Sequence, residues 1–166
     1  SSAGLKIYTT IDTDAQEYVE QLLNGDEISY PSKYFQAGIA LIDTTTGEIR
    51  AIGGERNQPI GGFNYAVDLK RQPGSTIKPI LDYGPAIEHL KWSTYHQIVD
   101  EPYTYSNGNP INNYDRSYKG QMSIREALAD SRNIPALKAF QEVGESRAKA
   151  FAEKLGIKID KITEAY

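Results

Sequence analysis

The chain contains 166 residues, of which 39% are hydrophobic and 24% are charged, a composition typical of one globular domain. A net charge of -4 and a pI near 5.2 leave no excess of basic side chains to neutralise a phosphate backbone, so nucleic acid is not expected as a partner. Cysteine is absent, and the two histidines, His89 and His96, stand in different contexts. Disulfides, a metal site and a cofactor are therefore not expected. The longest apolar runs, such as 38–42, are too short to span a bilayer.

The N-terminal segment predicts a strand followed by a helix. Residues 5–11 alternate and are rich in β-compatible side chains, which is typical of a strand. Thr13 and Gln16 form a capping-box pattern, and the amphipathic run that follows ends at Gly25. We therefore expect a helix between these points.

The next segment predicts a β-hairpin. Residues 36–43 and 48–53 are apolar, β-compatible runs. Between them lies a short polar turn whose Gly47 can adopt the positive φ that a hairpin requires. Antiparallel pairing of the two runs follows from so short a connection.

The middle of the chain predicts a helix and then a long irregular stretch. A glycine-rich polar loop leads into Pro73 and Gly74, and the residues from Ser75 to about Leu90 have helical apolar spacing. Residues 91–121 contain prolines, glycines and five tyrosines without a sustained period. We expect no regular structure there, and stretches of that length are usually functional or disordered.

Three short helices are predicted toward the end of the chain. Ser123 begins a capping box for a helix that runs to about Ala129, and Asn133 is expected to cap a second helix. That helix stops at Gly144, and a third runs to Gly156. The remaining residues, from Ile157 to Tyr166, have no clear assignment.

A hydroxyl and an amine stand three residues apart at Ser75 and Lys78, on one face of a helix's first turn. Serine is a poor nucleophile until a base accepts its proton, and a lysine serves as that base when burial or adjacent charge lowers its pKa. The N-terminus of the helix favours the negative charge that develops on the reacting oxygens. Pro79 lacks an N–H group and is expected to distort the start of the helix.

Spacing alone does not identify the pair, because Ser146 and Lys149 have the same spacing and are expected to lie on a solvated helix face. The context of Ser75 differs: Pro-Gly precedes it and Pro follows Lys78. The chain also contains a single Ser-x-Asn, formed by Ser131, Arg132 and Asn133. This combination favours a nucleophilic site.

Ser-x-x-Lys followed by Ser-x-Asn resembles the penicillin-binding proteins and serine β-lactamases, whose third signature is Lys-Thr/Ser-Gly on a late strand. Arg132 stands where class A β-lactamases carry Asp, which argues against a β-lactamase. Three segments resemble the transpeptidase domain of class A, bifunctional penicillin-binding proteins: 4–12, 74–79 and 129–135. The resemblance implies an α+β fold, an antiparallel sheet packed with helices. Residues 1–166 would then be the N-terminal portion of a single transpeptidase domain, incomplete without the late strands.

The resemblance also implies an activity and its residues. Ser75 would attack the penultimate D-Ala of a stem peptide ending in D-Ala-D-Ala, and β-lactams would acylate the same hydroxyl. Lys78 would accept the proton of Ser75, Ser131 would relay a proton to the leaving nitrogen, and Asn133 would hold the substrate amide. Lys78 is accordingly expected within hydrogen-bond reach of both serines. No cofactor is implied.

The relatives also imply neighbouring parts. They carry a glycosyltransferase domain and a membrane anchor ahead of the transpeptidase, which implies the extracytoplasmic face of a bacterial cell membrane. The Lys-Thr/Ser-Gly signature is not found in this sequence. We expect the C-terminal remainder of the domain, as a second chain, to supply that strand, and we expect residues 1–166 alone to bind β-lactams poorly.

Alternatives remain open at the level of sequence. Serine and asparagine at a corner between helices usually act as caps, which is the competing interpretation of Ser131 and Asn133. A β-lactam-sensing receptor domain and a catalytically silent module of the same fold are the rival functions. The tyrosines of the irregular stretch either line a binding groove or attach the stretch to the core: Tyr95, Tyr103, Tyr105, Tyr114 and Tyr118.

Overall fold

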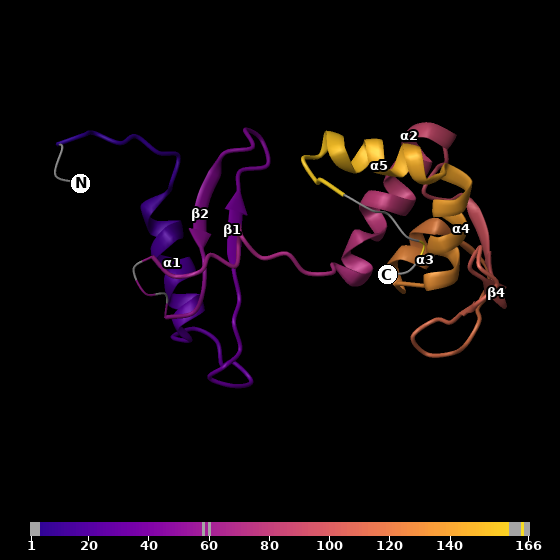
Figure 1. Ribbon diagram of the computed structural model, residues 1–166, viewed down its shortest axis with the longest axis horizontal. Helices are drawn as coiled ribbons and strands as arrows, with labels where there is room; N and C mark the ends of the chain where they lie inside the picture. The colour runs from indigo at the N-terminus through magenta and orange to yellow at the C-terminus, as the bar shows by residue number, and fades with distance from the viewer. Residues whose placement is uncertain (1–3, 58, 60, 160–163, 165–166) are drawn as a thin grey trace. The chain divides into compact units, whose positions relative to one another are not determined.

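The computed structural model describes residues 4–57, 59, 61–159 and 164. The chain divides into two compact units, residues 1–71 and 72–166, and each is considered by itself (Figure 1). The described residues of the first unit form one helix and one hairpin, and those of the second form the remaining helices and short strands. No described helix combines the length and the apolar character needed to cross a bilayer.

In the first unit, helix α1 (Thr13–Asn24) packs on the hairpin of β1 (Ile39–Ile42) and β2 (Ile49–Gly53) (Figure 1). Val19, Leu23 and Ala51 form the buried contact. A Cβ atom at Gly53 would lie 2.2 Å from a methyl carbon of Leu23, so a side chain there would displace the Leu23 side chain that packs on the strand. The predicted helix and hairpin are therefore confirmed, including the left-handed Gly25 that ends α1.

Two predictions for the start of this unit were wrong. The described residues 4–12 form no strand. The N–H of Asp12 donates to the carbonyl of Arg50, but the bonds of Thr10 to the hairpin run through side chains, its own hydroxyl to Ile49 and the Arg50 guanidinium to its carbonyl. Ile7 and Tyr8 are largely exposed. Alternation produces a strand only where a partner supplies a ladder. The cap of α1 is Asp12 rather than Thr13: the Asp12 carboxylate accepts the N–H of Ala15 at 3.0 Å.

The second unit opens with a helical run of changing pitch: η1 (Gly74–Ile77) is a 3-10 turn, η2 (Pro79–Tyr83) is π-helical and α2 (Gly84–Leu90) is α-helical. Neither Pro79 nor Pro85 has an N–H group, so the regular i→i−4 ladder cannot form across them. The N–H of Gly84 bonds instead to the carbonyl of Pro79, five residues back. The expected distortion at the start of the helix is confirmed.

The stretch expected to be irregular contains short strands, so that expectation was wrong in part. β3 (Gln97–Asp100) pairs antiparallel with β6 (Gly120–Ser123), and β4 (Tyr103–Thr104) pairs with β5 (Pro110–Ile111). Strands of two to four residues are too short to establish an alternating pattern in sequence, and they are defined by pairing with residues up to 26 positions away.

The last three helices follow the predicted order: α3 (Ile124–Ala129), α4 (Asn133–Val143) and α5 (Glu145–Lys154). The capping box of Ser123 and Glu126 is present in both directions. Gly144 separates α4 from α5 at a φ of 86°, where a side chain would be strained. Residues 157–159 carry no regular structure, and most of the remaining C-terminal residues lie outside the described part of the chain.

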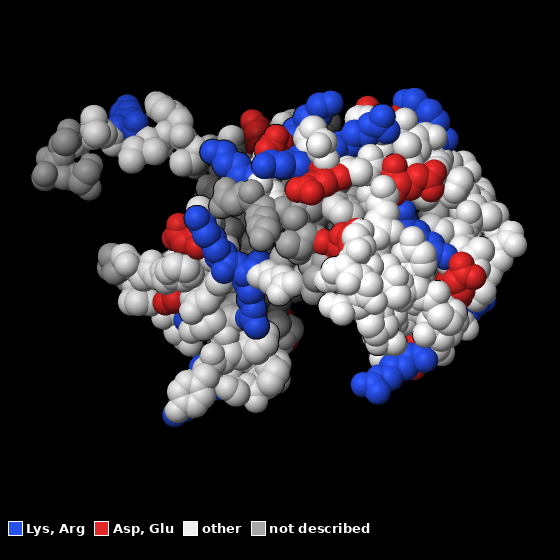
Figure 2. All heavy atoms as spheres, turned by 45° about the vertical axis from the view of Figure 1, so that its right-hand side comes forward, with Lys and Arg blue, Asp and Glu red and all other residues white. Residues whose placement is uncertain are grey.

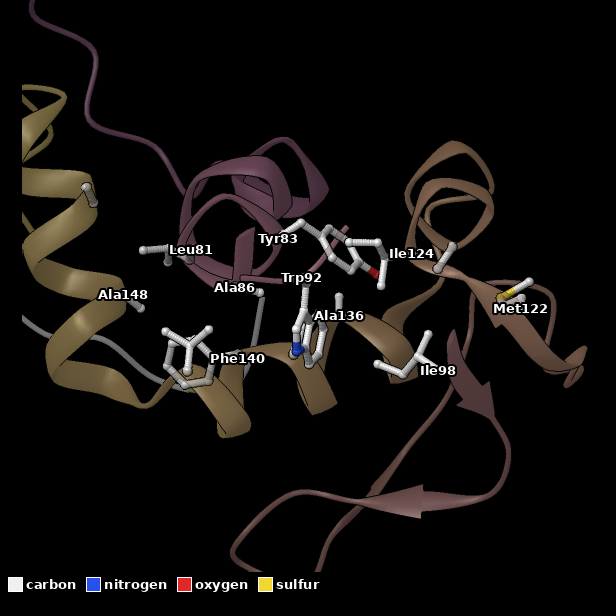
Figure 3. Close-up of a cluster of buried hydrophobic side chains, with 14 residues drawn as sticks. Leu81, Tyr83, Ala86, Trp92, Ile98, Met122, Ile124, Ala136, Phe140 and Ala148 are labelled. Carbon is white, nitrogen blue, oxygen red and sulfur yellow. The ribbon is translucent and has the colours of Figure 1, made fainter. Parts of the chain in front are cut away.

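The core of the second unit forms where η2 and α2 pack on α4 and α5. Figure 3 shows Leu81 from the π-helical turn directed toward the α5 side of the cluster, where Ala148 lies, and Tyr83 directed toward Ile124. Helices packed with small antiparallel sheets make this an α+β structure, as predicted. The helix that carries Lys78 is thus held by the buried centre of the unit.

The close approach of helices at Gly84 gives a first prediction. A Cβ atom there would lie 2.4 Å from the carbonyl oxygen of Pro79 and 2.9 Å from the ring of Phe151. Gly84→Ala should therefore lower the free energy of unfolding by about 1–3 kcal/mol, although alanine is the better helix former. Urea denaturation followed by the fluorescence of Trp92, the single tryptophan, measures this.

The matched control is Glu88→Ala on the exposed face of the same helix, which should change stability by less than about 0.5 kcal/mol. Equal stability of Gly84→Ala and the unmodified chain would contradict the proposed crowding at this position.

Candidate active site

Lys78 is the centre of the candidate site. Its side chain is 0% exposed, and its Nζ lies 2.7 Å from the carbonyl oxygen of Ser131, 3.2 Å from Ser131 Oγ and 2.7 Å from Asn133 Oδ1. A lysine ammonium has three N–H donors, so three acceptors can stabilise it away from water. The structure thus brings three of the four predicted site residues together, from segments more than 50 positions apart.

Ser75 lies one 3-10 turn before Lys78, in η1. The backbone N–H of Lys78 donates to the carbonyl of Ser75, which holds the two residues one 3-10 turn apart. The side chain of Ser75 is exposed, whereas that of Lys78 is buried. The expected contact of Lys78 with Ser131 is present, and the contact of Lys78 with the Ser75 hydroxyl stays a prediction.

Ser131 occupies a backbone position that normally belongs to glycine. It follows the end of α3 with a φ of 51°, in the left-handed region. Its N–H bonds to Leu128 and the next N–H, of Arg132, bonds to Ala127, which is the Schellman pattern that ends many helices. A serine in the glycine position of this motif costs free energy, and it directs a hydroxyl toward Lys78.

Asn133 does not cap α4, which corrects the sequence-based expectation. It is the first helical residue, its Oδ1 accepts from Lys78, and its Nδ2 donates to the carbonyl of Asn112. The cap comes from another segment: Asn113 Oδ1 accepts the N–H groups of Asn133 at 2.8 Å and of Ile134 at 3.4 Å. Because Asn113 supplies the cap, the Asn133 side chain remains in the site.

The electrostatic environment of Lys78 shifts its amine toward the neutral form. Burial lowers the pKa of Lys78 from its usual 10.5 to about 8; the carboxylate of Asp82, one turn further along, opposes this shift, and the guanidinium of Arg132 adds to it. About a tenth of the lysine is then neutral at pH 7. A lysine so poised can accept and return a proton near neutral pH.

Arg132, at the middle of Ser-x-Asn, is fully buried in an ionic network that the sequence analysis missed. Its Nε lies 2.8 Å from Asp100 and its Nη1 lies 2.7 Å from Asp115. Asn113 donates to Asp100 at 2.7 Å and thereby joins this network to the cap of α4. The Arg132 contact holds the pKa of Asp115 well below its usual range. Three of these partners lie in the stretch without a period, so only the unusual Arg132 gave a signal.

The competing serine–lysine pair lies elsewhere. Ser146 is exposed on the first turn of α5, as expected of a solvated face. Figure 2 shows acidic and basic side chains intermixed on the face in view. Among the described residues, no group of His, Cys, Asp and Glu is placed to hold a metal ion.

The tyrosines of the 91–121 stretch divide into two sets. Tyr103 and Tyr105 pack on the cluster formed by Ile111, Ile134 and Leu137, so these two attach the stretch to the core. They also line a hollow of about 840 Å³. The other three tyrosines are exposed, by 71%, 76% and 45% for Tyr95, Tyr114 and Tyr118.

Comparison with known proteins identifies the family of this chain. The sequence model of the family described as "Penicillin binding protein transpeptidase domain" matches residues 37–164. The chain belongs to this family. The match includes the segments that carry Ser75, Lys78, Ser131 and Asn133, and the expected class A penicillin-binding protein transpeptidase is confirmed.

Relatives and solved structures of penicillin-binding proteins extend the match. The chain is 60% identical over its whole length to penicillin-binding protein 1A/1B of Bacillus subtilis, covering 18% of that protein. It is 40% identical over 94% of its length to penicillin-binding protein 1A of Streptococcus pneumoniae, covering 22% of it. The chain thus spans about a fifth of the length of these curated relatives.

Two solved structures share the fold. PonA1 of Mycobacterium tuberculosis in complex with penicillin V is 26% identical, with a TM-score of 0.77 over 94% of this chain and 40% of that one. Penicillin-binding protein 1A of Haemophilus influenzae is 29% identical, with a TM-score of 0.65 over 74% of this chain and 18% of that one. The penicillin-binding fold expected from the sequence is confirmed.

The left-handed conformation of Ser131 gives a second prediction. Ser131→Gly should be more stable than Ser131→Ala by about 1 kcal/mol, because both remove the hydroxyl and only alanine retains the steric cost of a Cβ atom at positive φ. The comparison of these two variants by urea denaturation isolates the backbone strain. Equal stability, or a more stable alanine variant, would refute it.

Proposed function

We propose that this chain carries the nucleophile and the proton-transfer residues of a peptidoglycan D,D-transpeptidase, with Ser75 as the nucleophile. The observation that carries the proposal is the buried Lys78, held by Ser131 and Asn133 one turn from the exposed Ser75. The reaction cross-links stem peptides ending in D-Ala-D-Ala. β-Lactams acylate the same hydroxyl in place of the peptide.

The first half-reaction forms an acyl-enzyme. The Oγ atom of Ser75 bonds to the carbonyl carbon of the penultimate D-Ala, the bond to the terminal D-Ala breaks, and the Ser75 proton passes by way of Lys78 to the departing amine. In the second half-reaction an amine of a neighbouring stem peptide attacks the ester. Its proton returns to Ser75 as the peptide cross-link forms and the serine is released.

The partners of Lys78 support a proton route through Ser131. Two of the three acceptors are carbonyl oxygens, which only accept, and the third is the Ser131 hydroxyl, which also donates. A neutral lysine can donate to the two carbonyl oxygens and accept the proton of Ser131. Among these partners, Ser131 is thus the group able to exchange a proton with the lysine.

We further propose that residues 1–166 belong to a single transpeptidase domain, whose Lys-Thr/Ser-Gly strand is supplied by its C-terminal remainder. The full-length protein would also carry a peptidoglycan glycosyltransferase domain and would act at the extracytoplasmic face of the bacterial cell membrane. The similarity to penicillin-binding proteins 1A and 1A/1B supports this arrangement.

The nucleophile assignment predicts where penicillin attaches. In the full-length protein, Ser75→Ala should abolish covalent labelling by a fluorescent penicillin, because the attacking oxygen is removed. Peptide mass spectrometry locates the adduct. The control is Ser146→Ala, which removes the other Ser-x-x-Lys hydroxyl and should label like the unmodified protein. An adduct on any other residue would overturn the assignment.

The role of Lys78 predicts a pH dependence. If neutral Lys78 accepts the proton, the acylation rate constant should rise with pH and level off above about 8, where the amine is mostly neutral. Lys78→Arg should slow acylation by about 100-fold or more, since a guanidinium does not give up its proton. Stopped-flow labelling between pH 6 and 10 measures both.

Lys149→Arg, at the competing pair, should leave the rate and its pH profile unchanged. A flat profile in the unmodified protein, or a Lys78→Arg variant that acylates at the normal rate, would exclude Lys78 as the base.

A further inference from the structure

The buried ion pair of Arg132 and Asp100 requires an explanation beyond stability. Both side chains are 0% exposed. Removing two charges from water costs several kcal/mol per ion, and replacing such a pair with apolar residues is often neutral or stabilising. Arg132 nevertheless places each nitrogen of its guanidinium on a partner: Asp100, Asp115 and the carbonyl of Ser117.

The network converges on the residues that hold Lys78. Asp100 accepts from Arg132 at 2.8 Å and from Asn113 at 2.7 Å. Asn113 in turn accepts the backbone N–H of Asn133 at 2.8 Å. Its amide nitrogen donates to Asp100 and Ser117, so the side chain is used on every side. Arg132 directly, and Asn133 by way of Asn113, are therefore linked to the buried carboxylate of Asp100.

The peptide group between Ser131 and Arg132 is the point at which this anchoring reaches the site. Its carbonyl oxygen, from Ser131, accepts from Lys78 Nζ at 2.7 Å, and its N–H, from Arg132, donates to Ala127 at 2.8 Å. A rotation of this peptide plane would break both bonds. Ser131 lies at positive φ, a conformation that persists only where the surroundings over-determine it.

We propose that Arg132 is a positioning residue: its guanidinium, clamped by Asp100 and Asp115, fixes the Ser131–Asn133 corner so that Ser131 and Asn133 stay on Lys78. This inference rests on the proposed transpeptidase function. It adds a role for the middle residue of Ser-x-Asn, whose buried guanidinium bonds to Asp100, Asp115 and Ser117. Misplacement of reacting groups by about 1 Å can cost about 100-fold in rate, so loosening this corner should slow the chemistry.

The test uses a double variant of the full-length protein, Asp100→Asn with Arg132→Met, which removes both buried charges together. Removing Arg132 alone would leave a buried carboxylate and risks unfolding the domain. Penicillin acylation is followed by stopped flow and resolved into the noncovalent dissociation constant and the first-order acylation constant. The acylation constant should fall about 10- to 100-fold, and the dissociation constant should change less than about 3-fold.

A second variant keeps the test decisive if the double variant fails to fold. The carboxylate of Asp115 is partly exposed and is the outer anchor of Arg132. Asp115→Asn weakens this anchor and should slow acylation about 3- to 10-fold. The control is Lys138→Met, which removes another cation that links α4 to the β3 segment through Val99 and Glu101. The hydrogen bonds of Lys138 lead to Val99 and Glu101 rather than to the Ser131–Asn133 corner, so its variant should acylate at the normal rate.

The amplitude of labelling separates positioning from a merely structural role. A structural defect lowers the fraction of protein that can be labelled, whereas a loosened corner slows the rate constant of all the protein. Normal rate constants in a folded double variant, or in Asp115→Asn, would overturn the proposal. If the unmodified protein does not label at Ser75, the proposed function itself fails.

Discussion

The burial of the Lys78 amine is the constraint on which the rest of the second unit depends. An ammonium taken out of water must be surrounded by acceptors or must lose its proton, and here both tendencies are visible. Three oxygens from the Ser131–Asn133 corner accept its N–H groups, and its pKa is lowered to about 8. The two parts of the site therefore depend on each other: the buried amine needs the oxygens of the Ser131–Asn133 corner, and these oxygens need its N–H groups.

The irregular helix around Lys78 follows from the same constraint. The side chain must leave the helix toward α4 while Ser75, one turn earlier, stays exposed. A 3-10 turn precedes the lysine and a π-helical turn follows it, so the side chains around Lys78 depart from the regular angular spacing of an α-helix. Pro79 and Pro85 make the regular ladder impossible at this point, and the buried Leu81 and Tyr83 attach the altered turn to the core.

The sequence was most informative where a local rule has a direct structural result. The capping box at Ser123, the glycine that ends α1 and the turn of the hairpin all formed as predicted, because each depends on a few neighbouring residues. Interactions between distant segments could not be predicted from one sequence. Strands β3 and β6 and the asparagine that caps α4 are defined by partners 20 or more positions away. Residues 5–11 illustrate the opposite error, a local pattern without a partner.

The same reasoning explains why the corner motif reads ambiguously in sequence. Asparagine is a common capping residue, and Asn133 stands where a cap is expected. Its side chain contacts Lys78 instead, because Asn113 caps α4. The Asn133 carboxamide is then oriented by two contacts, Oδ1 on Lys78 and Nδ2 on the carbonyl of Asn112. An amide nitrogen carries two hydrogens, and Asn112 takes one of them. Under the proposed function, the second hydrogen would hold the substrate carbonyl while Oδ1 stays on Lys78, and this combination requires the cap of α4 to come from Asn113.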